Sequence, residues 1–172
     1  MTRDLRPTLV FGGTFDPTHY GHLRPARELV SALGLAEVRF IPAANPPHRS
    51  PPVAASADRL KKLQLAIARE PGFVADDREI RRGGPSYTIL TLEELRGELA
   101  GQRLCLIMGM DAFLGLDSWH RWQELWGHAH IVAIPRPGWS VQQGLPAWAR
   151  PRLCRDAREL TQTPVGRLWV QP

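Results

Sequence analysis

Two histidines, His19 and His22, stand three positions apart shortly after a pair of glycines, Gly12 and Gly13. Glycine adopts backbone conformations that other residues avoid, and it lets a ligand approach the main chain closely. Imidazole groups donate hydrogen bonds and can carry positive charge near neutral pH. These residue types at this spacing indicate a site for a phosphate group.

The neighbouring residues predict how this segment is held. The apolar run 8–10 predicts a buried strand, and residues 23–33 carry apolar side chains at helical spacing. The start of a helix presents unpaired N–H groups and the positive end of its dipole, which together attract anions. The order strand, glycine-rich turn, helix therefore supports the phosphate site. Asp16 precedes a proline and is also typical of a turn, so a purely structural role for it stays open.

Other phosphate and metal motifs do not fit this segment. No Lys-Ser or Lys-Thr follows the glycines, as a Walker loop requires, and the spacing G-x-G-x-x-G is absent. A zinc site would need further ligands, and the two cysteines, Cys105 and Cys154, lack metal-type spacing. We expect no metal ligands from protein side chains.

Composition and charge narrow the class of protein. The 172 residues, 43% of them hydrophobic, suffice for one domain with a full core. The formal net charge of +5 favours anionic ligands, but no basic run indicates a nucleic-acid tail. The sequence shows no signal-type apolar region and no stretch of membrane-spanning length. We expect a cytoplasmic protein without nucleic-acid or membrane partners, and whether it forms a homo-oligomer stays open.

Strands and helices alternate along the chain. Apolar runs between turn residues predict strands at 8–10, 37–42, 72–75, 104–109, 130–134 and 166–170. Helical spacing predicts helices at 23–33, 56–70, from 86–88 through Glu98, 111–116, 119–126 and 153–160. This alternation predicts an α/β fold, with a doubly wound and mostly parallel sheet, in a single domain over residues 1–172.

Ligands of such sheets bind beyond the carboxyl ends of the strands. Four segments would meet there, namely 12–22, 43–49, 109–111 and 135–138. We therefore predict one composite nucleotide site at this edge of the sheet.

Further side chains in and near these segments suit a nucleotide. Asn45, His48 and Arg49 lie in a proline-rich loop, and arginine binds phosphate with two parallel hydrogen bonds. Tyr87 and Thr88 stand at a predicted helix start, where hydroxyl and N–H groups would receive an anion or cap the helix.

The segments after the later strands add a carboxylate, an aromatic ring and a guanidinium. Gly109 permits close backbone approach, and Asp111 would accept hydrogen bonds from a sugar hydroxyl or cap a helix. Trp119 and His120 lie in an aromatic-rich segment, and an indole offers a flat face for a planar ring. Arg136 follows a strand end, where it would meet phosphates or lie on the surface.

The segment Gly13-Thr14-Phe15-Asp16-Pro17 with His19-Tyr20-Gly21-His22 resembles the signature of the nucleotidyltransferase superfamily. The later segments narrow the resemblance to the bacterial nicotinate-nucleotide adenylyltransferase family. These are Asn45-Pro46-Pro47-His48-Arg49, Pro85-Ser86-Tyr87-Thr88, Gly109-Met110-Asp111, Ser118-Trp119 and Arg136-Pro137-Gly138. The resemblance implies a Rossmann-like fold and a reaction of NAD biosynthesis, in which nicotinate mononucleotide and ATP give deamido-NAD and pyrophosphate.

The resemblance also implies roles for individual residues. His19 and His22 would be catalytic, and Mg²⁺ would accompany ATP. Residues implied in ATP binding are Gly12, Gly13, Thr14, Phe15, His19, His22, Gly109, Asp111 and Arg136. Residues implied in binding nicotinate mononucleotide are Asp16, Asn45, His48, Arg49, Tyr87, Thr88, Trp119 and His120.

Family members continue into a Ser-Ser/Ala-Thr-x-x-Arg helix start and a C-terminal helix, which we expect these 172 residues to lack. Two alternatives remain beside the main interpretation. One is another adenylyltransferase of the superfamily, acting on nicotinamide mononucleotide or phosphopantetheine. The other is a protein that binds nucleotides or RNA without catalysis. The degree of preference for nicotinate over nicotinamide stays open.

Overall fold

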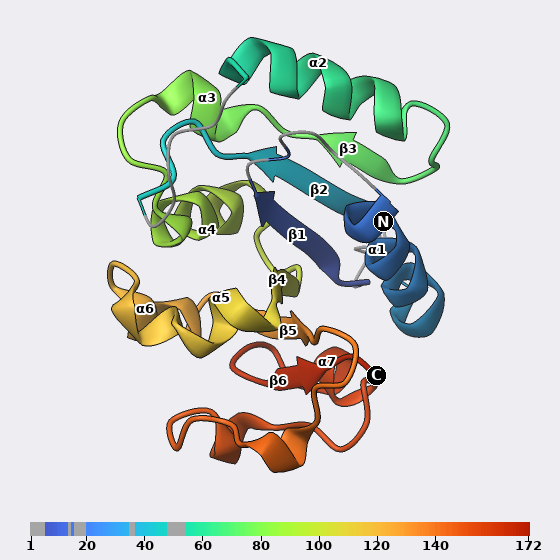
Figure 1. Cartoon of the computed structure of the whole chain (residues 1–172), viewed down its shortest axis with the longest axis vertical. Helices are drawn as coiled ribbons and strands as arrows, with labels where there is room; N and C mark the ends of the chain where they lie inside the picture. Colours follow the sequence, from blue (N-terminus) through green and yellow to red (C-terminus); the bar gives the residue numbers. More distant parts are fainter. Residues whose placement is uncertain (1–5, 14, 16–19, 35–36, 48–53) are drawn as a thin grey trace.

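A six-stranded sheet forms the centre of the molecule (Figure 1). The computed structural model describes the chain except residues 1–5, 14, 16–19, 35–36 and 48–53, and the side chains of residues 20–22 and 142. All neighbouring strands pair in parallel, in the order β3-β2-β1-β4-β5-β6. The strands are β1 (Thr8–Gly13), β2 (Glu37–Pro42), β3 (Phe73–Ala75), β4 (Leu104–Gly109), β5 (His130–Ile134) and β6 (Leu168–Val170).

Helices cover both faces of this sheet. The α-helices are α1 (Tyr20–Leu33), α2 (Ser56–Ile67), α3 (Arg78–Arg82), α4 (Thr88–Glu98), α5 (Met110–Leu114), α6 (Trp122–Leu125) and α7 (Glu159–Gln162). Three short 3₁₀ helices are η1 (Leu116–Ser118), η2 (Val141–Gln143) and η3 (Arg150–Arg152). In the described part of the chain, no helix has the length and apolar character needed to cross a bilayer.

The side-chain alternation of the strands divides the core between the two faces. Leu9 and Phe11 of β1 pack in one cluster with apolar residues of α1, α2 and α7. Val10, between them, packs in the other cluster with residues of α4, α5 and α6. The central strands are apolar on both faces because helices cover both, as is typical of parallel sheets.

The predicted α/β class and the doubly wound parallel sheet are confirmed, and each predicted strand corresponds to a strand of the structure. The order reverses between β1 and β4, since successive strands are added on one side of β1 and then on the other. In doubly wound sheets the crevice at such a switch point is where ligands bind.

Several helix boundaries differ from the sequence prediction. Helix α1 begins at Tyr20, three residues before the predicted start, and α2 ends at Ile67, before Pro71 and Gly72. Residues 111–116 divide into α5 and η1. The predicted helix 119–126 shortens to α6 because Arg121 adopts a left-handed conformation, with φ of 52°.

The prediction of a helix over 153–160 was largely wrong. The N–H of Cys154 donates to the carbonyl oxygen of Leu168 at 2.7 Å, and Leu153 forms an isolated parallel bridge with Leu168. This segment therefore lies beside β6, and only α7 at its end is helical. Pairing with a sheet edge, which sequence spacing does not reveal, has displaced the helical conformation.

Candidate active site

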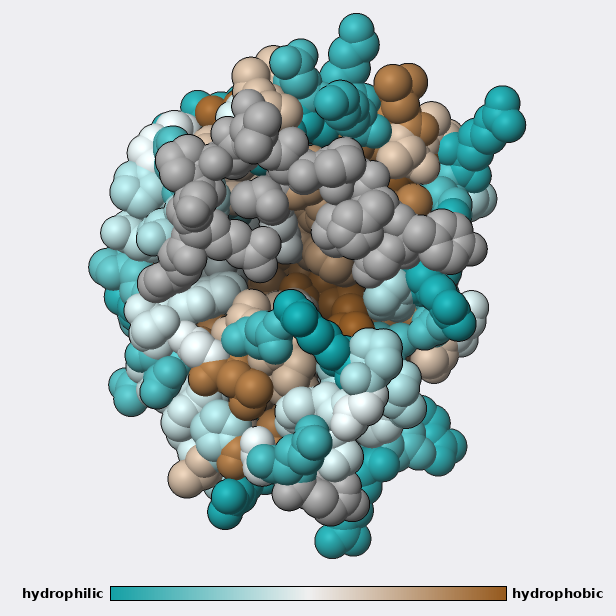
Figure 2. Space-filling model, viewed as in Figure 1, coloured by the Kyte–Doolittle hydropathy of each residue, from teal (hydrophilic) through white to brown (hydrophobic). Residues whose placement is uncertain are grey.

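A cavity of about 1080 Å³ opens at the carboxyl ends of β1, β4 and β5. Figure 2 shows a hollow with an apolar floor in the middle of this face. All four segments expected to converge there contribute lining residues, through Gly12, Pro46, Gly109 and Arg136 among others. The predicted convergence at one edge of the sheet is therefore confirmed.

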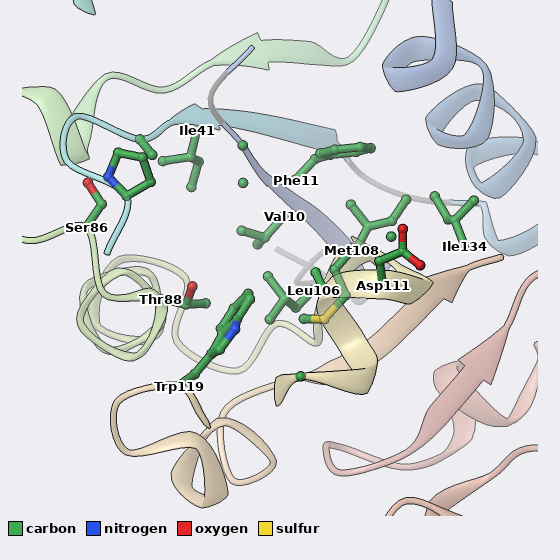
Figure 3. A pocket seen from close by; sticks show the side chains of 18 of the residues that line it. Val10, Phe11, Ile41, Ser86, Thr88, Leu106, Met108, Asp111, Trp119 and Ile134 are labelled. Atoms are coloured by element: carbon green, nitrogen blue, oxygen red, sulfur yellow. The ribbon is translucent and has the colours of Figure 1, made fainter. Parts of the chain in front are cut away.

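The floor of the cavity is apolar, and its walls carry the polar groups. Val10, Leu106 and Met108 come from the central strands and lie in the middle of the view in Figure 3. These side chains pack in one buried cluster with apolar residues of α4 and α5. A rigid apolar floor with a few polar groups around it is typical of small-molecule sites.

The glycine-rich end of β1 forms one wall. A Cβ atom built on Gly12 would have no described atom within 4 Å, so this backbone faces open space. At Gly13 the same atom would lie 3.4 Å from the Phe15 ring, and the carbonyl oxygen of Gly13 accepts from the N–H of Ala43 at 2.8 Å. Gly12 is thus the position where a ligand can approach the main chain closely.

Phe15 was expected at the ATP site, but its ring packs inside the protein. The side chain is 1% exposed, and its ring centroid lies 5.8 Å from that of Phe11 and 5.9 Å from that of Phe40. Its backbone is left-handed, with φ of 48°. The ring is a packing element behind Gly13, so any contact of this residue with a ligand would come from its backbone.

The start of α4 faces Trp119 across the cavity. Figure 3 shows the Trp119 ring beside Thr88, the first residue of α4. The indole is half-buried, with its packing partners in the core cluster below. His120 stacks on Tyr87, with ring centroids 4.3 Å apart and planes at 28°. All four of these predicted residues line the cavity.

The residues around the start of α4 do not cap the helix with their side chains. Tyr87 occupies the N-cap position and makes no side-chain capping hydrogen bond among the described residues. The Ser86 hydroxyl instead accepts from the N–H groups of Ala44 and Asn45, at 3.0 and 3.1 Å. Among the described residues, the N–H groups of Thr88 and Ile89 have no partner, because a helix supplies none for its first N–H groups, and they can bind a ligand or water.

Asp111 and Arg136, which both line the cavity, form an ion pair. Their carboxylate and guanidinium are 2.6 Å apart, and both side chains are largely exposed. Asp111 is the second residue of α5, whose N-cap is Gly109, so of the two alternatives for Asp111 the capping role is wrong. An exposed ion pair contributes little to stability, which leaves both groups free to exchange partners with a ligand.

Asn45 has a structural role that the sequence did not reveal. Its side-chain N–H donates to the carbonyl oxygen of Gly84 at 2.9 Å, and its carbonyl oxygen accepts from the N–H of Ser86 at 3.0 Å. Asn45 is not among the described lining residues of the cavity. It fastens the loop after β2 to the turn before α4.

Five predicted site residues lie outside the described part of the chain, namely Thr14, Asp16, His19, His48 and Arg49. For His22 only the backbone is described, as the third residue of α1. The phosphate-binding roles of the two histidines therefore stay predictions.

Sequence reasoning missed Glu79, a buried carboxylate that lines the cavity from α3. Residues 78–82 are too few to show helical spacing, and Glu79 stands among arginines, as surface carboxylates often do. Burial raises the pKa of Glu79, and hydrogen bonds from Thr91 and Ser86 act against this rise. Its position shortly before Ser86-Tyr87-Thr88 is the feature of the sequence that could have indicated Glu79 as a site residue.

This chain is similar in sequence to known nucleotidyltransferases. The family model described as cytidylyltransferase-like matches residues 10–163. A relative from Aeromonas hydrophila named "probable nicotinate-nucleotide adenylyltransferase" is 52% identical over 171 residues, 96% of this chain and 79% of the relative. A relative of the same name from Halorhodospira halophila is 45% identical over 173 residues, 99% of this chain and 79% of the relative.

Solved structures share the fold at low sequence identity. One is described as Plasmodium falciparum nicotinic acid mononucleotide adenylyltransferase complexed with NaAD. It matches with a TM-score of 0.71 at 13% identity, over 96% of this chain and 74% of that chain. A structure of the same enzyme complexed with APC matches with a TM-score of 0.65 at 15% identity, over the same shares of the two chains.

Proposed function

Because this chain belongs to the nicotinate-nucleotide adenylyltransferase family of cytidylyltransferase-like proteins, we propose that it joins nicotinate mononucleotide to the adenylyl group of ATP. The products are deamido-NAD and pyrophosphate, in NAD biosynthesis. The observation that carries the proposal is that one cavity holds both Gly12 and Gly109, suited to a nucleotide backbone, and Trp119 beside Thr88, suited to a pyridine carboxylate.

The reaction needs no nucleophile from the protein. A phosphate oxygen of nicotinate mononucleotide forms a bond to the α-phosphorus of ATP, and the bond from that phosphorus to the bridging oxygen of the β-phosphate breaks. Pyrophosphate leaves with the electron pair of that bond. Positioning and electrostatic stabilisation can carry such a transfer. His19 and His22, at the start of α1, would stabilise the charge that develops on the phosphates.

The geometry supports a division of the cavity into two halves. The triphosphate and adenosine would lie along Gly12, Gly109 and the ion pair of Asp111 and Arg136. When ATP binds, Arg136 would exchange Asp111 for a phosphate, and Asp111 would accept from a sugar hydroxyl. Guanidinium groups suit phosphate because they donate two parallel hydrogen bonds.

The pyridine half would lie between Trp119 and the start of α4. The indole face would stack on the pyridine ring, and the first N–H groups of α4, with the Thr88 hydroxyl, would receive the carboxylate. A carboxylate gains from a helix N-terminus, whereas a neutral amide gains less and would bring two further donors. This arrangement favours nicotinate over nicotinamide.

Mg²⁺ would enter with ATP and offset the charge of the triphosphate. Within the described ranges, no three His, Cys, Asp or Glu side chains gather as a metal site. The ion would be held by phosphate oxygens and water, without a ligand from a protein side chain.

A pyrophosphate-release assay tests the proposal. With ATP and Mg²⁺ present, nicotinate mononucleotide, nicotinamide mononucleotide and phosphopantetheine are supplied in turn, and the dinucleotide product is identified by mass. We expect the highest kcat/KM with nicotinate mononucleotide. Preferred turnover of another acceptor, or ATP binding without turnover of any, would contradict the proposal.

A further inference from the structure

Glu79 is a buried carboxylate that the proposed reaction does not use. It belongs to α3, is 6% exposed, and lines the cavity below the start of α4. A carboxylate is costly to bury unless hydrogen bonds and opposite charges compensate for the lost water. Its partners therefore indicate why it is placed there.

Two hydroxyl groups and one arginine compensate the buried charge. The Thr91 hydroxyl donates to Oε2 of Glu79 at 2.6 Å and accepts from Arg82 Nη2 at 3.3 Å. The Ser86 hydroxyl and the Arg82 charge both favour the ionised form of this carboxylate. Thr91 lies one turn along α4 from Thr88, and Ser86 lies just before the helix.

The Ser86 hydroxyl fixes the direction of these hydrogen bonds. A hydroxyl has one hydrogen and two lone pairs. The N–H groups of Ala44 and Asn45 donate to Ser86 Oγ at 3.0 and 3.1 Å, which occupies both lone pairs. The hydrogen of Ser86 is therefore left to be donated, and the Glu79 carboxylate, which already accepts from Thr91, is suited to receive it as well.

Glu79 is thus linked to two elements that are far apart in sequence. Through Ser86 it holds the loop after β2, in which Ala44 and Asn45 stand shortly before His48 and Arg49. Through Ser86 and Thr91 it holds the start of α4, which carries Tyr87 and Thr88. Both elements belong to the pyridine-nucleotide half of the proposed site.

We propose that Glu79 is a positioning residue for nicotinate mononucleotide, which sets the loop after β2 against the start of α4 through Ser86. The inference rests on the proposed function, because it assigns both elements to that substrate. Glu79 would have little effect on the binding of ATP, since the residues expected around the triphosphate follow β1, β4 and β5. A purely structural role would lower stability without separating the two substrates.

Glu79→Gln is the primary test. Glutamine has a single acceptor oxygen, so it cannot accept from both Ser86 and Thr91, and one of these two hydroxyl hydrogens loses its acceptor. We expect the KM for nicotinate mononucleotide to rise about tenfold, as for a lost hydrogen bond to a charged group. We expect the KM for ATP to stay within about twofold, and titration calorimetry with nicotinate mononucleotide alone should show the same loss of affinity.

Glu94→Gln is the matched control. Glu94 also pairs with Arg82, at 2.8 Å, and the substitution removes the same charge, but Glu94 is not among the described lining residues. We expect both KM values to stay at the wild-type level. An equal rise from Glu94→Gln, or a Glu79→Gln protein with an unchanged KM for nicotinate mononucleotide, would overturn the inference. Equal rises for both substrates would also overturn it.

Ser86 provides a second test if Glu79→Gln fails to fold. Ser86→Ala removes the hydroxyl that joins the two elements, whereas Ser86→Thr retains it. We expect the KM for nicotinate mononucleotide to rise in the alanine variant and to recover in the threonine variant. Equal KM values in the two variants would contradict the inference. Failure of the wild-type protein to turn over nicotinate mononucleotide would instead refute the proposed function on which it rests.

Discussion

Trp119→Ala removes the flat face that the account assigns to the pyridine ring. Trp119 is half-buried, lines the cavity and packs against the core cluster beneath it. The substitution leaves Gly12, Gly109 and the Asp111–Arg136 pair in place. It should therefore weaken the binding of one substrate and spare the other.

The size of the effect follows from the lost stacking and the lost burial. Stacking contributes about 0.5–1.5 kcal/mol beyond burial. About 50 Å² of pyridine surface returned to water, at about 25 cal/mol per Å², adds about 1.25 kcal/mol. The sum is about 1.75–2.75 kcal/mol, which predicts a rise of roughly 20- to 100-fold in the KM for nicotinate mononucleotide.

The assay is steady-state pyrophosphate release with each substrate varied in turn, with Trp122→Ala as the control. Trp122 is also half-buried, and its ring lies 5.0 Å from that of Trp148, but it is not among the described lining residues. Both variants should lose about 1–3 kcal/mol of unfolding free energy. Only Trp119→Ala should raise the KM for nicotinate mononucleotide. An unchanged KM, or the same rise in Trp122→Ala, would refute the stacking role.

Three further predictions test other parts of the account. His22→Ala should lower kcat by about 10²–10³-fold at an unchanged melting temperature, and near wild-type turnover would remove this histidine from the chemistry. Gly12→Ala adds a methyl group with no described atom within 4 Å, so the melting temperature should change little. The KM for ATP should rise severalfold. An unchanged KM would show that ATP does not approach Gly12. Burial lowers the pKa of His130, whose Nδ1 accepts from the N–H of Arg167 at 3.0 Å while its Nε2–H donates to the carbonyl oxygen of Thr163 at 2.9 Å. Because the folded state favours the neutral ring, its stabilisation is complete above pH about 6.5 and falls as the pH decreases toward the lowered pKa. Urea unfolding at pH 7.5 and 5.5 should show this loss in the wild type and a smaller loss in His130→Asn, and equal losses would contradict it.

The strands and the position of the site could be predicted because the signals are local. Runs such as 104–109 are apolar throughout and are bounded by turn residues, and parallel strands bring their carboxyl ends to one edge. Gly12 and Gly109 line the cavity for this reason, whereas Thr88 and Trp119, which also line it, were expected at the site from the family resemblance.

The parts that could not be predicted depend on tertiary neighbours. The Phe15 ring lies in the core because Phe11 and Phe40 provide an aromatic pocket that no local pattern shows. The Ser86 hydroxyl binds the distant loop at Ala44 rather than capping α4, although its position suited a cap equally well. Glu79 became visible as a site residue only when the fold brought it to Ser86 and Thr91.

In the proposed function the two substrates occupy one cavity, with the pyridine ring against Trp119 and the adenosine toward Gly109. A crystal structure of the protein with deamido-NAD bound tests it most directly. We expect the pyridine ring on the indole, with its carboxylate at the start of α4 and the adenosine beyond β4. A dinucleotide bound outside this cavity, or bound with its adenine on Trp119, would contradict it.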